Sequence, residues 1–136
     1  MLVISLSSSR ISGSMIFISK NEKGETKIDK ILAMKPGDRM VTKRLRPVLP
    51  GVRAVQPGRG KHQVCKIRVV SCVLHWEWYW ARIHPCSDVV KQQRLDNEAR
   101  LEGFETWQGF LDCINGMHKK IDLNELYRIE FEKVQQ

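Results

Sequence analysis

The stretch Gly37-Asp38-Arg39-Met40-Val41-Thr42-Lys43-Arg44-Leu45 places three cationic side chains around one neutral hydroxyl. Pro36 ends the helix expected before it, and the glycine that follows permits a turn that other residues resist, so a short loop is predicted here. Cationic donors around Thr42 suit an anionic or electron-rich ligand, such as a phosphate or the edge of a nucleobase. The alternative is a solvated basic loop without a ligand, because basic runs are common on protein surfaces.

A short helix is predicted just before this stretch. Thr26 with Asp29 three residues later forms a capping pair. Apolar residues then follow at i, i+3 and i+4, the spacing of one buried helical face: Ile28, Ile31 and Leu32. The helix should run to about Lys35. Residues 15–18 are expected to form a first strand, and the serine-rich residues 1–14 a flexible arm that precedes a single domain over residues 15–136.

A long basic loop and a basic strand are predicted after the stretch. Residues 46–61 contain three prolines and three glycines, which favours a long functional or mobile loop. Residues 62–74 alternate as a strand does, with one face predicted to be buried: Cys65, Ile67, Val69, Ser71 and Val73. Lys66 and Arg68 lie on the opposite face, where they would extend the basic surface, and Arg68 would bind the ligand.

Residues 75–80 read His-Trp-Glu-Trp-Tyr-Trp. If this segment is extended, its three tryptophans, Trp76, Trp78 and Trp80, share one face on which bases could stack. The alternative is that the rings fill the core or hold a hairpin together, with one of them, Trp76, facing a ligand.

The second half of the chain is predicted to be helical before it closes with a strand. Ser87 or Asp88 can cap a helix to about Leu101, and Thr106 can cap a second helix that Gly116 ends. The second helix has the clearest apolar stripe: Trp107, Phe110, Leu111 and Ile114. The closing strand has one buried face: Tyr127, Ile129 and Phe131. This order predicts an α+β fold with a mostly antiparallel, barrel-like sheet.

The charge distribution favours a nucleic-acid partner. The 136 residues carry a formal net charge of +8, with 15 Lys and Arg against 4 Asp and Glu in residues 1–68, and 8 against 11 in residues 69–136. One basic face is typical of proteins that bind nucleic acid. The four cysteines and four histidines show no metal-ligand spacing, so no metal and no cofactor are expected. The sequence contains no apolar run long enough to cross a bilayer and no secretory signal, so a cytoplasmic location without a membrane partner is expected.

Two motifs together resemble the ASCH family, relatives of the PUA RNA-binding domain. The stretch Gly37–Leu45 looks like the family's G-x-K-x-x-T-x-R loop, and Glu102-Gly103-Phe104, followed by two aromatic residues, looks like its second signature. The resemblance covers residues 15–134. It implies a PUA-like β-barrel with flanking short helices, and a cleft that binds RNA or a modified nucleoside.

A small bacterial branch of the family hydrolyses the acetyl amide of acetylcytidine. There a Thr is the nucleophile, a loop Lys is its base, and a Glu completes the site, which the resemblance transfers to Thr42, Arg39 and Glu102. Arginine cannot accept the Thr proton because it stays protonated in proteins. Three possibilities follow. Lys35 or Lys43 could act as the base instead, Glu102 could act as the base, or the chain has lost the ability to hydrolyse the amide.

Three hypotheses follow. The first is an ASCH-type domain that binds RNA, a nucleoside or single-stranded nucleic acid in a cationic cleft formed by Arg39, Thr42, Lys43, Arg44, Arg68 and Trp76. The second is an amidohydrolase that acts on an N-acetylated cytidine-type nucleoside, with catalytic residues Thr42, Glu102 and Arg39. The third is a protein-interaction module that uses exposed aromatic residues and the acidic second half.

Overall fold

The computed structural model describes residues 13–117 and 122–134, and these form an α+β fold, as predicted. The elements, in chain order, are β1 (Ser14–Ile16), α2 (Lys27–Ala33), β2 (Arg39–Arg44), β3 (Gly51–Gln56), β4 (Cys65–Leu74), α3 (His75–Arg82), α4 (Asp88–Leu101), α5 (Trp107–Met117), a 3-10 turn η1 (Leu123–Glu125) and β5 (Tyr127–Lys133). Residues 1–12 of the predicted arm lie outside the described residues, and Ser14 already belongs to β1.

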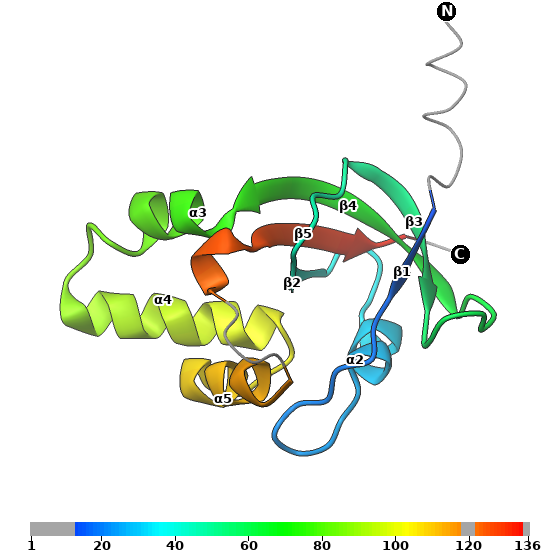
Figure 1. The fold of residues 1–136 in the computed structure, drawn as a ribbon, viewed down its shortest axis with the longest axis horizontal. Coiled ribbons are helices and arrows are strands. Elements are labelled where there is room, and N and C mark those ends of the chain that lie inside the picture. The colour runs from blue at the N-terminus through cyan, green and yellow to red at the C-terminus, as the bar shows by residue number, and fades with distance from the viewer. Residues whose placement is uncertain (1–12, 118–121, 135–136) are drawn as a thin grey trace, which may run out of the picture.

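The five strands form one curled sheet in the order β1-β3-β4-β5-β2 (Figure 1). β1 pairs parallel with β3, and the other three pairings are antiparallel, so the sheet is mixed but mostly antiparallel, as expected. The expectation of a barrel is met only in part, because β1 and β2 are the two edge strands and the sheet ends there as a half-barrel. We call the gap between the open edges of β1 and β2 the seam.

The apolar core fills the inside of the curl. Ile129 and Phe131 on β5 are fully buried, as are Ile67 and Val69 on β4. Phe17, just after β1, packs its ring 5.6 Å from that of Phe131. Helices α2, α4 and α5 lie together below the sheet in the view of Figure 1, where their apolar faces close the core.

The stretch that was predicted to be a loop is mainly a strand. Only residues 34–38 form the turn, with Gly37 at a positive φ of 92°, and Arg39–Arg44 continue as β2 against β5. Arg39–Arg44 pair with residues 127–132 without a break. This continuous ladder satisfies the backbone that a loop would leave to water. The basic residues therefore stand on a rigid strand.

The prediction of a long loop over residues 46–61 is also wrong in part. Gly51–Gln56 form β3, with Ala54 and Val55 buried against the core. The prolines and glycines flank this strand rather than interrupt it. Arg53 is buried as well, because its guanidinium donates to the Leu49 carbonyl at 2.7 Å and to the Val52 carbonyl at 3.1 Å.

The predicted strand over residues 62–74 is confirmed as β4, but its alternation changes half-way. A β-bulge between Val69 and Ser71 shifts the register against β5. Because a bulge reverses which side chains face the core, Cys72 packs against the core while Val73 is exposed, contrary to the predicted pattern.

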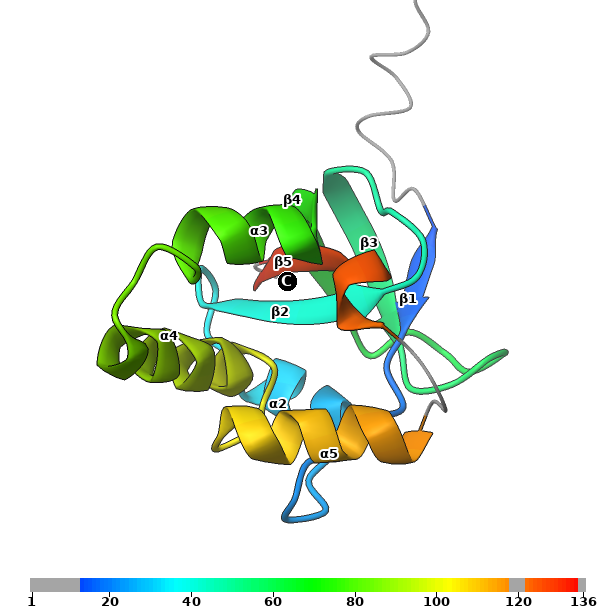
Figure 2. The ribbon, with the colours of Figure 1, turned by 60° about the vertical axis from the view of Figure 1, so that its left-hand side comes forward.

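The extended arrangement of tryptophans is wrong, because residues 75–82 form helix α3. Trp76 and Trp80 are four residues apart and lie on the exposed side of that helix, whereas Trp78 turns inward. Figure 2 shows α3 next to the end of β4 and joined by a loop to α4. The sheet therefore offers no row of three stacked rings.

Three predicted helices are confirmed with their caps. The Thr26 hydroxyl accepts from the Asp29 N–H at the start of α2, and the Ser87 hydroxyl accepts from the Val90 N–H at the start of α4. Leu32, which was expected to be buried, is 44% exposed. Helix α5 runs through Gly116 to Met117, so the predicted end at the glycine is wrong.

Candidate functional site

A pocket of about 430 Å³ lies at the seam, and we call it the seam pocket. Its walls come from the segment after β1, the end of β2, the turn after α4, helix α5 and the residue before β5. Its polar lining residues are Ser19, Lys27, Thr42, Lys43, Arg44 and Glu102, and its apolar lining includes Phe17, Ile18, Leu45, Phe104, Phe110, Ile114 and Leu126. The volume is in the range of small-molecule sites and exceeds what a water or an ion needs.

Glu102 is delivered to the pocket by the end of helix α4. Its N–H closes the last turn of the helix, and Gly103 follows with a positive φ of 94°. The Phe104 N–H then donates to the Ala99 carbonyl at 2.8 Å, so the chain reverses tightly as it does at glycine-terminated helices. Glu102 and Phe104 are consequently both directed into the pocket. This geometry explains why Glu102, Gly103 and Phe104 occur together in the sequence.

The amine of Lys27 is the least expected group in the pocket. Lys27 is the first residue of α2, is 5% exposed, and donates to the Val41 carbonyl at 2.6 Å, to the Glu102 carbonyl at 2.8 Å and to Glu102 Oε1 at 3.1 Å. Burial disfavours its charged form and lowers the pKa of Lys27, and the Glu102 charge offsets this only in part. Three acceptors around one amine match the three donors of an ammonium ion.

An alternating chain of ion pairs runs from Lys27 to the surface. Lys43 Nζ donates to Glu102 Oε2 at 2.8 Å and to Glu98 Oε2 at 2.7 Å. Arg128 holds the other side of Glu98 with two hydrogen bonds, at 2.6 Å and 2.8 Å. Arg128 also donates to Glu130, which pairs with Arg39 at 2.7 Å. Every charge in this series of ion pairs thus lies next to a charge of the opposite sign.

Arg44 spans the seam and contacts Thr42. Its Nη2 donates to the Ile16 carbonyl at 2.7 Å, across from β2 to the end of β1, and its guanidinium lies 4.8 Å from the centre of the Phe17 ring. Its Nε is 3.4 Å from the Thr42 hydroxyl oxygen, which accepts. A side chain held at three points fixes the distance between the two edge strands and orients the hydroxyl.

The structure brings four of the predicted site residues together and leaves three elsewhere. Thr42, Lys43, Arg44 and Glu102 line the seam pocket. Arg39 is half exposed and paired with Glu130, Arg68 is paired with Glu132 on the outer face of the sheet, and Trp76 is on the outer side of α3. These last three do not line the pocket, so the expectation that they form one cleft with Thr42 is wrong.

Sequence reasoning missed Lys27 and Glu98. A signal for each was present, because Lys27 is four residues before the buried Ile31, and Glu98 is four residues before Glu102. Residues four apart share a helical face, so both polar side chains point the same way as a residue already placed inside. A lysine on an apolar helical face was not considered as part of the site.

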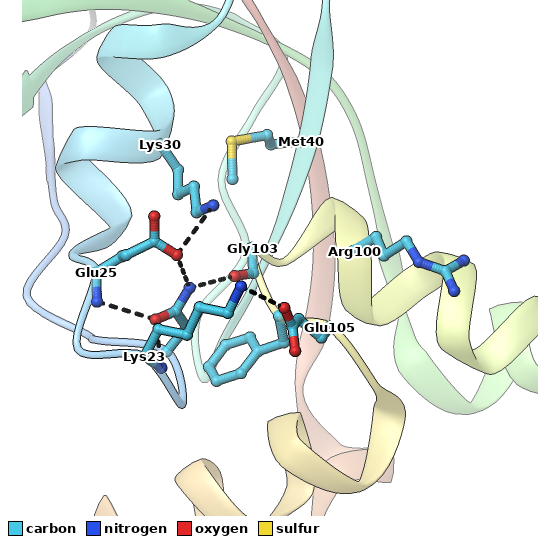
Figure 3. A pocket seen from close by; sticks show the side chains of 9 residues that line it. Lys23, Glu25, Lys30, Met40, Arg100, Gly103 and Glu105 are labelled. Atoms are coloured by element: carbon cyan, nitrogen blue, oxygen red, sulfur yellow. Dashed lines mark hydrogen bonds and ion pairs between the residues drawn. The ribbon is translucent and has the colours of Figure 1, made fainter.

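A second hollow of about 290 Å³ lies on the other side of the Glu102–Phe104 turn (Figure 3). Four of its charged groups are paired with each other, Lys23 with Glu105 at 2.6 Å and Lys30 with Glu25 at 3.3 Å. Asn21 is held there too, by Glu25 and the Gly103 carbonyl. This second hollow is smaller than the seam pocket, and most of its charged groups are exposed, which makes the seam pocket the better candidate.

The described residues contain neither a candidate metal site nor a helix that could span a membrane. In residues 13–117 and 122–134, no group of three His, Cys, Asp or Glu side chains is placed to hold a metal ion. No helix in the same residues has the length and apolar character needed to span a membrane. In comparisons with protein-family models, with curated proteins and with solved structures, nothing matches this chain.

Proposed function

We propose that the seam pocket binds the base of a nucleoside, free or within single-stranded RNA, as the resemblance to the ASCH family implies. The observation that carries this proposal is the pairing of the charges around the pocket. Lys27 and Lys43 share the Glu102 carboxylate, and Lys43 is also paired with Glu98. Apart from Arg44, whose guanidinium is held by the Ile16 carbonyl, these charges are compensated, which favours a neutral ligand that forms hydrogen bonds over a bare phosphate.

The remaining walls support a planar ligand. Phe104 and Phe110 meet edge to face, with ring centroids 5.5 Å apart, and Leu126 and Ile114 add further apolar lining to the polar residues of β2. A flat base with polar atoms along its rim fits a pocket that has both apolar and polar lining. Exposed Ile18 and Leu45 at the pocket add apolar surface where a ribose would leave it.

Filling the pocket should prevent binding. Replacing Ile114 with tryptophan is expected to weaken the binding of cytidine and uridine by at least about tenfold, because the larger side chain takes up space that the base needs. Asp112→Trp is the matched control, since residue 112 is exposed on the same helix. Isothermal titration at two salt concentrations, with free nucleosides and with a single-stranded RNA, measures both variants and the wild type.

Free nucleosides should bind with little salt dependence, and RNA should bind with more if its phosphates contact the basic half of the chain. Equal affinities of Ile114→Trp and the wild type would show that the ligand binds outside the seam pocket. If neither nucleosides nor RNA bind the wild type, the proposal is wrong.

Hydrolysis of an N-acetylated cytidine is a second candidate, and the position of Lys27 favours it. The objection from the sequence was that Arg39 cannot take a proton from Thr42. Lys27 supplies a buried amine of lowered pKa to the same pocket. Thr42 Oγ1 would attack the acetyl carbon, and the N4 amine of the cytidine would leave with a proton. Water would then cleave the resulting acetyl–Thr42 ester. In the structure Lys27 carries the hydrogen bonds of an ammonium ion, so it must lose a proton first; binding therefore ranks above hydrolysis.

The hydrolysis candidate predicts a specific pattern of activities with N4-acetylcytidine. Thr42→Ala and Lys27→Met are each expected to reduce acetate release by about 100-fold or more, because they remove the nucleophile and its base. Arg39→Ala should keep the wild-type rate, since Arg39 is paired with Glu130 away from the pocket. A wild type without activity, or a Thr42→Ala variant with full activity, rules out this mechanism.

A further inference from the structure

The open edge of β2 faces the seam pocket, and the backbone groups exposed at this edge indicate which ligand the pocket can bind. In an antiparallel strand, alternate residues direct their N–H and C=O groups to opposite sides. The Asp38 carbonyl accepts from the Lys133 N–H at 3.3 Å, so residues 38, 40, 42 and 44 bond to β5. The Val41 carbonyl accepts from Lys27 Nζ instead, so residues 39, 41 and 43 face the open side.

Lys43 is therefore the residue whose backbone is presented to the pocket. Its N–H and C=O point to the same side as the Val41 carbonyl, and β2 has no strand on that side, because it is the last in the sheet order. Lys27 already satisfies the Val41 carbonyl, and Val41 does not line the pocket. Among the described residues, no side chain or backbone group from another element hydrogen-bonds the Lys43 peptide groups. A donor and an acceptor of one extended residue remain available side by side at the pocket wall.

We propose that the Lys43 N–H and C=O bind the edge of a base at which a hydrogen-bond acceptor is next to a donor. This inference rests on the proposed function and narrows it to ligands with an amide or amidine edge. Two parallel hydrogen bonds form, as between one pair of residues in an antiparallel ladder. Uracil offers O4 and N3–H, and cytosine offers N3 and the N4 amine.

The surroundings of Lys43 support edge recognition at this point. Its side chain is fixed by Glu98 and Glu102, at 2.7 Å and 2.8 Å, so the backbone at Lys43 is held rigidly. The Thr42 hydroxyl is on the neighbouring residue and lines the same pocket. Groups fixed before the ligand arrives lose little entropy on binding and reject ligands that leave them unpaired.

Backbone NMR with uridine and 3-methyluridine tests this inference directly. Uridine is expected to move the Lys43 amide resonance downfield and to slow its hydrogen exchange. The amide of Thr42 serves as the internal control, since Thr42 already pairs with Ile129 of β5 and its signal should change much less. The compound 3-methyluridine lacks the donor of that edge and should bind at least about tenfold more weakly, because it leaves the Lys43 carbonyl unpaired.

The outcomes separate this inference from the proposed function. If uridine shifts signals of Phe110 and Ile114 but leaves the Lys43 amide unchanged, the pocket binds bases and the edge recognition is wrong. Equal affinity for uridine and 3-methyluridine also contradicts edge recognition. If uridine changes no signal of the pocket, both the proposed function and the inference fail.

Discussion

Replacing Glu98 with alanine is expected to lower the free energy of unfolding by about 3–5 kcal/mol, the usual cost of leaving buried charges without their partner. Glu98 is 2% exposed and accepts from Lys43 Nζ at 2.7 Å and from Arg128 at 2.6 Å and 2.8 Å. Its removal leaves two cations between α4 and the sheet, with Lys43 dependent on Glu102 alone and Arg128 on Glu130 alone.

The charge state of Glu98 agrees with this role. Burial by itself would raise its pKa, but the hydrogen bonds from Arg128 and the charge of Lys43 outweigh burial, and the pKa of Glu98 is lowered. The folded state thus stabilises the charged form of the Glu98 carboxylate more than water does. The stability that it contributes is present above the ordinary pKa of a glutamate and is lost as the pH falls through the lowered value.

Glu105→Ala is the matched control for this experiment. Glu105 forms an equally short ion pair, 2.6 Å from Lys23, but both side chains are about 60% exposed. Exposed pairs contribute about 0–1 kcal/mol because water and salt screen them. Urea denaturation of the two variants and the wild type measures the difference. Equal losses in the two variants would show that the buried chain of ion pairs does not support the fold.

The same residues show how much of the fold follows from local sequence patterns. The apolar stripes of α2 and α5 and the alternation in β5 are local signals, and these elements are confirmed. β2 and β3 were missed because prolines and glycines lie at or near the ends of both strands and arginine occurs in both. β2 depends on pairing with β5, which lies far away in the chain, and β3 on pairing with the next strand, β4; local propensity reports neither pairing.

The site was predictable where its residues are consecutive in one sequence motif, because the position of one residue then fixes the positions of its neighbours. Thr42, Lys43 and Arg44 are consecutive at the end of β2 that reaches the pocket, so placing one there placed the others. Arg39 is the first residue of β2, at the opposite end of the strand, and does not line the pocket. Lys27 came from another element, and only the curl of the sheet and the end of α4 bring it to Glu102.

His75 should make the protein sensitive to acid. Its ring is 2% exposed, among Trp78, Tyr79 and Trp107, with which it makes ring contacts of 5.2–6.4 Å. Burial and the nearby Lys43 lower the pKa of His75 to about 4, although Glu98, Glu102 and the Asn124 side chain act in the opposite direction. In the unfolded chain the pKa is near 6.5.

Between these two values the unfolded chain binds a proton that the folded chain excludes, so stability falls as the pH drops from 6.5 towards 4. A difference of about 2.5 pKa units corresponds to about 3 kcal/mol. His75→Phe keeps an aromatic ring among its three neighbours and removes the titrating group. Relative to the wild type, this variant is expected to gain about 3 kcal/mol between pH 7 and pH 4.

Chemical denaturation at intervals of half a pH unit measures this gain, and the comparison of two proteins at each pH cancels the contribution of carboxylates that both contain. His84→Phe is the control, since His84 is exposed two residues after the end of the same helix, and His75 is intact in that variant. It should follow the wild-type curve. If His75→Phe follows that curve as well, the buried imidazole is protonated in the folded protein, and the charges of Glu98 and Glu102 govern its titration more strongly than burial does.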